Sequence, residues 1–177
     1  MLNERAQDAF SVQNYGGTRQ IEGVEIVNLR RFNDDGGSMT ELGRLNEGLH
    51  ADLPGFTVKQ VNYSVMDPGV IKAFHLHRRQ TDVWYVPPSS KMLVVLGDTR
   101  TGSPTENEVR RIVMGDGNSR LLRIPPGVAH GVRNIGQSDG QIIYFVDTQF
   151  DPDPDNCDEG RIPWDHFGAE IWEKERG

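Results

Sequence analysis

Cysteine is almost absent from this chain of 177 residues, in which Cys157 is the only one. A single thiol can form no disulfide within the chain and cannot build a cysteine-rich zinc site. Long apolar runs are also absent, and none approaches the roughly 20 residues that a membrane-spanning helix needs. The first ten residues, MLNERAQDAF, lack the charged-then-apolar pattern of a secretion signal. We therefore expect a cytoplasmic protein that does not associate with a membrane.

Basic residues are also fewer than acidic ones. Lys and Arg total 19 against 26 Asp and Glu, which gives a formal net charge of −7. This balance argues against a nucleic-acid partner or an anionic membrane surface, because both attract basic proteins. It still allows a local basic pocket for a small molecule that carries phosphate. The length indicates one domain, which is large enough to bury a substantial core.

Short β-type segments bounded by Gly, Pro, Asp or Asn dominate the chain. The candidate strands are residues 23–29, 57–65, 70–77, 82–88, 91–98, 108–115, 119–126, 129–135 and 140–148. Their spacing of about 8–12 residues is typical of an antiparallel sandwich or barrel and not of strand–helix–strand units. We predict an all-β double-sheet roll with two short helices, at residues 39–47 and near 165–174. The predicted domain plan is an N-terminal arm (1–20), the roll (21–150) and a C-terminal extension (151–177).

Two histidines, His75 and His77, stand one residue apart in the stretch GVIKAFHLHRRQTD. Successive side chains of a strand point to opposite faces, so these two share one face. By the same rule Lys72 points to the other face unless a bulge intervenes. A third histidine, His130, follows a Pro-Pro-Gly turn in IPPGVAHGVRN. The two stretches fit the paired patterns of a cupin-type roll, G-x5-H-x-H-x(3–4)-E and P-x-G-x2-H-x3-N, with Asp82 in place of the glutamate.

The cupin pattern leaves two chemical interpretations open. His75, His77, His130 and Asp82 together would suit Fe, Mn, Ni or Zn and leave positions for a substrate. Alternatively His75 is a free general base, and it cannot hold both roles because a metal occupies the lone pair that takes the proton. Asp82 has simpler interpretations too: it pairs with Arg78 or Arg79, or it orients a histidine by accepting its N–H.

Several longer motifs resemble the dTDP-4-dehydrorhamnose 3,5-epimerases and their sugar-nucleotide relatives, in the right order over about residues 22–172. GVIKAFHLH is similar to the family strand G-V-L-R-G-L-H-F-Q, and QVNYS is similar to Q-D-N-H-S. DTRTGSPT resembles D-x-R-x-G-S-P-T, IPPGVAHGV resembles I-P-P-G-F-A-H-G-F, and RIPWD resembles the closing R-W-D segment. The resemblance implies an isomerase of the cupin superfamily that forms homodimers by exchanging an N-terminal strand and needs no cofactor.

The resemblance also implies roles for single residues. His75 falls at the catalytic base and Tyr144 at the catalytic acid of an epimerisation beside a 4-keto group of a nucleotide-linked 6-deoxy sugar. The residues implied for substrate binding are Gln60 and Asn62, which contact the nucleotide, together with Lys72, His130 and Glu41. A base and an acid on opposite faces of the sugar are what such a reaction needs.

The chain departs from the family pattern at residues close to the expected site. His77 replaces a glutamine, Asp82 replaces the lysine that helps to hold the enolate, and Phe150 replaces a second pocket tyrosine. The family's aspartate that pairs with the base belongs to a region beyond Gly177. Two alternatives to the epimerase therefore stay open: a metal-dependent cupin enzyme that uses the three histidines, and a sugar-nucleotide binding protein without catalysis.

Overall fold

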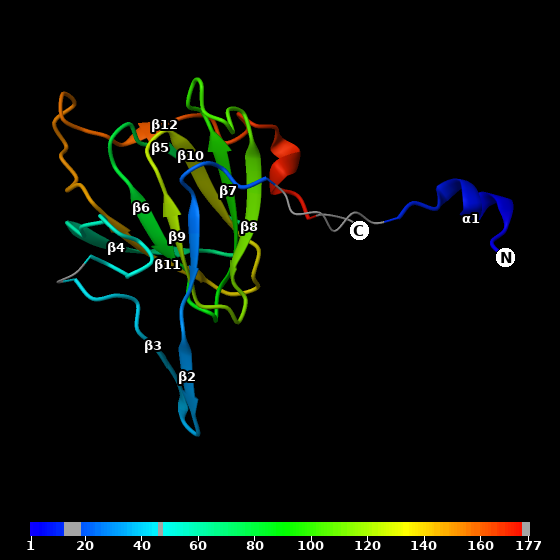
Figure 1. Ribbon diagram of the computed structural model, residues 1–177, viewed down its shortest axis with the longest axis horizontal. Coiled ribbons are helices and arrows are strands. Elements are labelled where there is room, and N and C mark those ends of the chain that lie inside the picture. Colours follow the sequence, from blue (N-terminus) through cyan, green and yellow to red (C-terminus); the bar gives the residue numbers. More distant parts are fainter. Residues whose placement is uncertain (13–18, 46–47, 175–177) are drawn as a thin grey trace.

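Two five-stranded antiparallel sheets form the body of the protein in the computed structural model, which describes residues 1–12, 19–45 and 48–174 (Figure 1). The first sheet has the order β1 (Glu25–Asn28), β9 (Arg120–Ile124), β6 (Asp82–Tyr85), β11 (Gly140–Val146) and β4 (Gln60–Met66). The second has the order β12 (Gly160–Arg161), β5 (Ile71–Leu76), β10 (Val128–Asn134), β7 (Lys91–Asp98) and β8 (Val109–Gly115). All the predicted strands are present, and the predicted all-β roll is confirmed.

The core lies between the two sheets and follows the alternation of their strands. Trp84, Leu122 and Ile142 point inward from the first sheet, and Met92 and Val94 meet them from the second. All five are at most 6% exposed. Residues that stand between these along the strands point outward, which is why each sheet also needs a cover on its other face.

Both outer faces are covered by segments that are not part of the sheets. Leu49, Leu53 and Phe56 pack on the outside of the first sheet. On the second sheet, Trp172 lies against the β5 residue Phe74. The β7 residue Gly97 leaves room for this C-terminal segment, because a Cβ there would overlap the ring of Phe167. These covers bury the outward side chains of the central strands, such as Phe74 and Tyr85.

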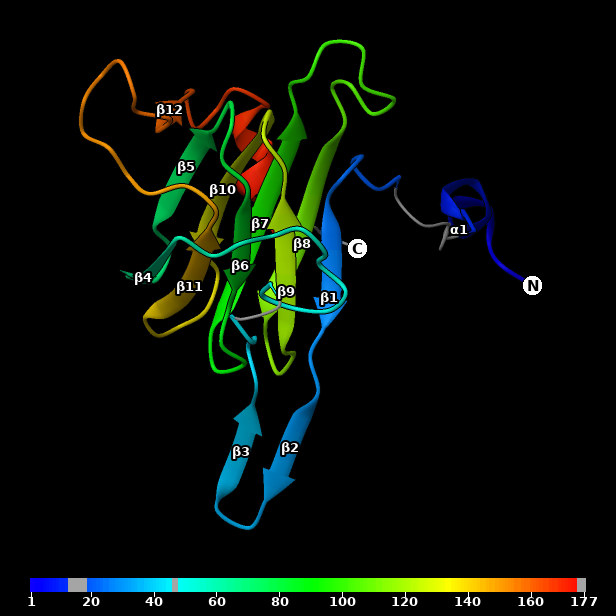
Figure 2. The same cartoon turned by 60° about the vertical axis from the view of Figure 1, so that its left-hand side comes forward.

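One predicted helix is wrong and one is confirmed. Residues 37–40 form strand β3 (Gly37–Thr40), and residues 41–45 contain no helix, while 46–47 lie outside the described residues. β3 pairs with β2 (Arg31–Asp34) in a hairpin that projects from the barrel (Figure 2). The turn NDDGG explains the hairpin, since Asp34 accepts a hydrogen bond from the backbone N–H of Gly36. The C-terminal helix appears as a short 3₁₀ helix, η1 (Ala169–Trp172).

The N-terminal arm contains a short helix, α1 (Glu4–Ala9), with none of its residues buried. The first barrel strand begins at Glu25 and β11 ends at Val146, which is compatible with the predicted domain plan. The boundaries of that plan stay a prediction. Among the described residues there is no helix long and apolar enough to cross a membrane.

Candidate functional site

An extra residue in β5 decides which side chains enter the cavity. His75 pairs with His130 of β10, and Lys72 pairs with Val132, so three steps along β5 match two along β10. Such a bulge reverses the alternation of the strand. Lys72 and His75 therefore reach the same side, because the bulge that parity alone could not include is present.

A cavity of about 540 Å³ between the two sheets collects most of the predicted site residues. Lys72 and His75 come from β5, His77 follows β5, Asp82 comes from β6, His130 from β10 and Tyr144 from β11. The wall also includes Glu159 and Arg161, which no sequence motif had assigned to the site.

The outer part of this cavity contains a histidine–carboxylate pair. His75 Nδ1 lies 3.4 Å from Glu159 Oε2, and the two side chains are 27% and 35% exposed. The hydrogen bond with His75 lowers the pKa of Glu159, which keeps this carboxylate ionised. Arg161 stands directly opposite His75 in the β12–β5 ladder. Glu159 lies in the acidic stretch DPDPDNCDEG, within the predicted C-terminal extension.

The inner part contains a second histidine–carboxylate group that is fully enclosed. His77 and Asp82 are each 3% exposed and His130 is 2% exposed. His77 Nε2 lies 3.8 Å from one oxygen of Asp82, and His130 Nε2 lies 3.6 Å from the other. Burial lowers the pKa of His130 to about 4, so its imidazole is neutral at neutral pH. Among the residues that the structure describes, none is a hydrogen-bond partner of His130 Nε2.

Neither Arg78 nor Arg79, both among the described residues, forms an ion pair with Asp82, so that simple interpretation is wrong. Its carboxylate accepts hydrogen bonds from Gln80 Nε2 at 2.8 Å and from Trp84 Nε1 at 3.0 Å. Arg79 lies near Asp158 instead, with its Nε 4.0 Å from a carboxylate oxygen. Gln80 is itself buried and lies between Asp82 and His77.

Asp158 fixes the turn that joins the two clusters. Its carboxylate accepts hydrogen bonds from the backbone N–H groups of Arg78, Arg79 and Gln80 at 2.8–3.0 Å. Burial alone would raise the pKa of Asp158, but these three hydrogen bonds outweigh it and lower the pKa. The backbone oxygen of Asp158 lies 2.6 Å from His77 Nδ1. The residue thus holds His77 directly and presents the adjacent Glu159 to His75.

Tyr144 faces the cavity from the opposite sheet to His75. Its ring lies beside Trp84, with the ring centroids 6.5 Å apart. Burial, and after it the negative charges of Glu159 and Asp82, raise the pKa of Tyr144. The phenol is therefore protonated at neutral pH and can donate a proton to a group in the cavity.

The predicted nucleotide contacts lie beside the cavity and not in its wall. Asn62 stands opposite Tyr144 in the β11–β4 ladder, and Gln60 donates a hydrogen bond to it at 2.9 Å. Ser64, two residues further on the same strand face, does line the cavity. Glu41 lies elsewhere: its carboxylate pairs with Arg44 at 2.9 Å, outside the residues that line the cavity.

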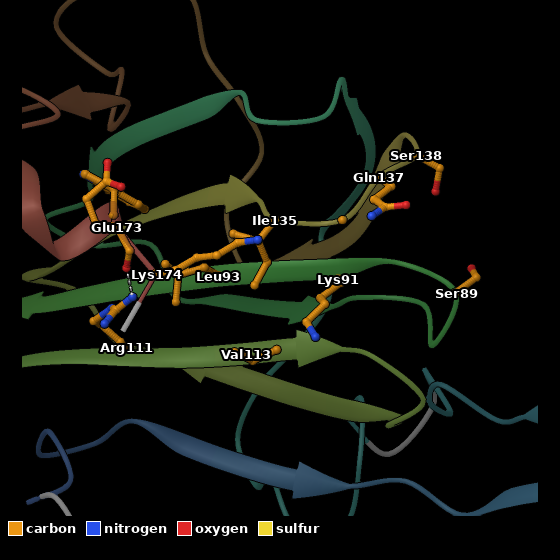
Figure 3. Close-up of a pocket in the computed structure, with 12 residues that line it drawn as sticks. Ser89, Lys91, Leu93, Arg111, Val113, Ile135, Gln137, Ser138, Glu173 and Lys174 are labelled. Atoms are coloured by element: carbon orange, nitrogen blue, oxygen red, sulfur yellow. Dashed lines mark hydrogen bonds between the residues drawn. The ribbon is translucent and has the colours of Figure 1, made fainter. Parts of the chain in front are cut away.

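A larger hollow of about 760 Å³ lies on the outer face of β7 and β8, against the C-terminal segment (Figure 3). Two of the charged groups on its wall have structural partners. Lys91 pairs with Asp116 at 3.0 Å, and Arg111 donates to the backbone oxygen of Glu173. Its described wall contains no histidine. The histidines and the tyrosine of the candidate site therefore lie in the other cavity, between the two sheets.

The family model of the dTDP-4-dehydrorhamnose 3,5-epimerases matches residues 18–172. This chain belongs to that family. The spore coat polysaccharide biosynthesis protein SpsL of Bacillus subtilis strain 168 is 44% identical over 145 residues, which are 82% of this chain and 91% of SpsL. The probable low-salt glycan biosynthesis epimerase Agl13 of Haloferax volcanii is 32% identical over 146 residues, covering 82% and 89% of the two chains.

A solved structure gives the same result for the fold. The dTDP sugar isomerase of Desulfovibrio desulfuricans G20 superposes with a TM-score of 0.70 at 27% identity, covering 88% of this chain and 91% of that one. The chain is thus a member of an isomerase family with a cupin-type roll. These matches favour an epimerase over a separate class of metal-dependent enzyme and over a binding protein without catalysis.

Proposed function

We propose that this protein epimerises a nucleotide-linked 4-keto-6-deoxy sugar by proton transfer beside the ketone, in the biosynthesis of a surface polysaccharide or deoxysugar. One observation carries the proposal: His75 and Tyr144 come from opposite sheets and line the same cavity. A base on one side and an acid on the other are what inversion of a carbon requires. The family name and the relatives' names support a dTDP-linked sugar.

His75 is the proposed base, and Glu159 is a positioning residue for it. A carboxylate beside Nδ1 favours the tautomer in which that nitrogen carries the hydrogen, which leaves the lone pair on Nε2 for the substrate proton. The same negative charge stabilises the imidazolium that forms. Glu159 thereby fills, within this chain, the role of a carboxylate partner for the base.

Tyr144 is the proposed acid on the other face of the sugar ring. The phenol stays protonated until the enolate has formed, and then protonates the carbon from the side opposite to His75. Neither step needs an organic cofactor, because the imidazole and the phenol carry both protons.

The cations and amides around the cavity suit a sugar nucleotide. Lys72 Nζ donates to Ser64 Oγ at 3.3 Å and to the Val65 carbonyl at 3.2 Å, which keeps the ammonium group at the cavity wall. Arg161 supplies a second positive charge for phosphate. The position of Asn62 opposite Tyr144, with Gln60 bonded to it, supports the proposal that these two amides contact the nucleotide.

We also propose a homodimer. The edge strand β4 exposes an apolar row, with Val61 at 52%, Tyr63 at 60% and Val65 at 44% exposure. The hairpin of β2 and β3 adds Phe32 and Met39, which are 43% and 57% exposed. An open strand edge with an apolar face favours pairing with another copy of the chain. The cytoplasmic location stays a prediction.

The test is proton exchange in heavy water. The protein is incubated with dTDP-4-keto-6-deoxyglucose, and deuterium at C3 and C5 of the sugar is followed by NMR and mass spectrometry. We expect incorporation at one or both carbons. Folded protein that incorporates no deuterium into this substrate, or into its UDP- and GDP-linked counterparts, would contradict the proposed function. Nucleotide binding without exchange would instead support a binding protein.

A further inference from the structure

Three buried side chains from separate parts of the roll converge on one point. His77 follows β5, Asp82 begins β6 and His130 lies on β10. One nitrogen of each histidine and one carboxylate oxygen lie within 4.8 Å of one another. The group borders the same cavity as His75.

The hydrogen bonds behind the two imidazoles define their tautomers. His77 Nδ1 lies 2.6 Å from the carbonyl oxygen of Asp158, and His130 Nδ1 lies 3.0 Å from that of Val128. A carbonyl oxygen can only accept, so each Nδ1 carries its hydrogen and donates. In the neutral form of each imidazole, Nε2 then presents its lone pair toward the carboxylate. Two lone pairs and a negative charge face one another inside the protein.

A proton shared between either Nε2 atom and Asp82 does not account for this arrangement. The two Nε2–oxygen distances, 3.6 and 3.8 Å, exceed the usual hydrogen-bond length of about 2.7–3.2 Å. Only Gln80 Nε2 approaches, 3.4 Å from His77 Nε2, and it already donates to Asp82. His130 Nε2 has no hydrogen-bond partner within the described part of the chain. A metal ion bonded at about 2.0–2.2 Å to each donor holds its ligands about 3–4 Å apart. The two nitrogen–oxygen distances, each to a different oxygen of Asp82, lie in this range.

We propose that His77, Asp82 and His130 bind one divalent first-row transition metal ion, and that His75 is not a ligand. Two neutral imidazoles and a carboxylate suit Zn²⁺, Fe²⁺, Mn²⁺, Co²⁺ or Ni²⁺ better than Mg²⁺ or Ca²⁺. The backbone carbonyls orient the rings as they do in other histidine metal sites. Asp82 accepts one hydrogen bond on each oxygen and keeps lone pairs for a metal.

A second possible set, His75, His77 and Glu159, is the weaker candidate. It shares His77, whose one free lone pair can serve only one ion. Its other members are partly exposed and already face each other, whereas the inner set has an unpartnered nitrogen. The inner set leaves His75 free, so a base and a metal can coexist in one cavity.

The binding of the ion does not depend on the proposed reaction, but its use there rests on the proposed function. An enolate that forms beside the buried carboxylate of Asp82 is disfavoured by like charge. A cation bound by His77, Asp82 and His130 would reverse the sign of that local field and stabilise the enolate oxygen.

Metal content and spectroscopy test the site directly. Untagged full-length protein is stripped with EDTA, dialysed and titrated with ZnCl₂ and CoCl₂ by calorimetry, while visible absorption follows Co²⁺. We expect one ion per chain, a Co²⁺ spectrum, and a melting temperature that rises with free metal. MgCl₂ should produce none of these changes. Stoichiometry well below one ion per chain, with no Co²⁺ spectrum, would overturn the proposal.

Variants identify the ligands. His130→Asn and Asp82→Asn should each weaken Co²⁺ binding by at least about 100-fold, more than loss of an orienting partner would. His75→Asn and the exposed His166→Gln should bind as the parent chain does. Equal loss in His75→Asn, or retained binding in folded His130→Asn, would overturn the assignment. Circular dichroism shows whether each variant folds. If a variant does not fold, the Co²⁺ spectrum of the parent chain still tests the metal site.

The exchange assay on the same samples separates the two proposals. Full metal occupancy without deuterium exchange refutes the proposed function and supports the metal site. Exchange by protein that binds no metal supports the proposed function and refutes the metal site.

Discussion

Two histidine–carboxylate clusters share one cavity and differ chiefly in their access to water. In the outer cluster, His75 and Glu159 are about one quarter and one third exposed. In the inner cluster, His77, Asp82 and His130 are at most 3% exposed. Water can hydrate an imidazolium in the outer cluster but not in the inner one, so only the outer cluster suits a base that gains and loses a proton. The inner cluster suits a fixed ion instead.

The largest effect that we expect in the outer cluster follows from removing the base. His75→Asn should lower the rate of deuterium incorporation by about 10³-fold, because general base catalysis typically contributes 10²–10⁴-fold. The measurement is deuterium uptake into the keto sugar by NMR, with His166→Gln as the matched control. Deuterium uptake at the parent rate in folded His75→Asn would show that another residue is the base. The outer cluster would then have no catalytic role that distinguishes it from the inner one.

Removal of the acid should separate exchange from inversion. Tyr144→Phe keeps the ring against Trp84 but has no proton to give to the far face of the sugar. We expect formation of the inverted sugar to fall by about 100-fold while deuterium uptake falls less. Product stereochemistry by NMR gives the first quantity and mass spectrometry the second. An equal fall in both would place Tyr144 in the abstraction step, on the same side as His75.

Loss of the carboxylate that orients the base should have a smaller effect. Glu159→Gln preserves shape and removes charge, so kcat should fall on the order of 10- to 100-fold with little change in KM. Glu159→Asp keeps the charge and should restore part of the activity, which a purely structural role would not predict. The exposed Glu170→Gln is the control. A change confined to KM would show that Glu159 binds substrate and does not position His75.

The fold could be predicted because it depends on signals that repeat along the chain. Alternating strands and turn residues at regular intervals defined the sheets, and parity placed His75 and His77 on one face. Lys72 could not be placed in this way, since one extra residue in β5 reverses the parity and leaves no mark in the sequence. The helix predicted at residues 39–47 failed because the turn before it forms a hairpin.

The site was predictable to the extent that its residues lie in motifs. His75, His130 and Tyr144 lie in strands whose pattern resembles the family, and all three reach the cavity. Glu159 comes from a loop more than 80 residues away in sequence from His75, and only the pairing of β12 with β5 brings the two together. Acidic residues crowd that loop, so nothing in composition distinguishes Glu159 from its neighbours.

Asp158 connects the two clusters, and its removal should have the smallest effect on catalysis while acting on both. Asp158→Asn keeps one acceptor oxygen but loses the negative charge and the second acceptor oxygen. In the parent chain the two carboxylate oxygens together accept hydrogen bonds from three backbone N–H groups. We expect a loss of about 1–3 kcal/mol in the free energy of unfolding, measured with urea, and less than a tenfold fall in deuterium uptake. The exposed Asp155→Asn is the matched control and should change neither. If Asp158→Asn abolished exchange without loss of stability, the turn would be part of the catalytic machinery, and the two clusters would have to be treated as one.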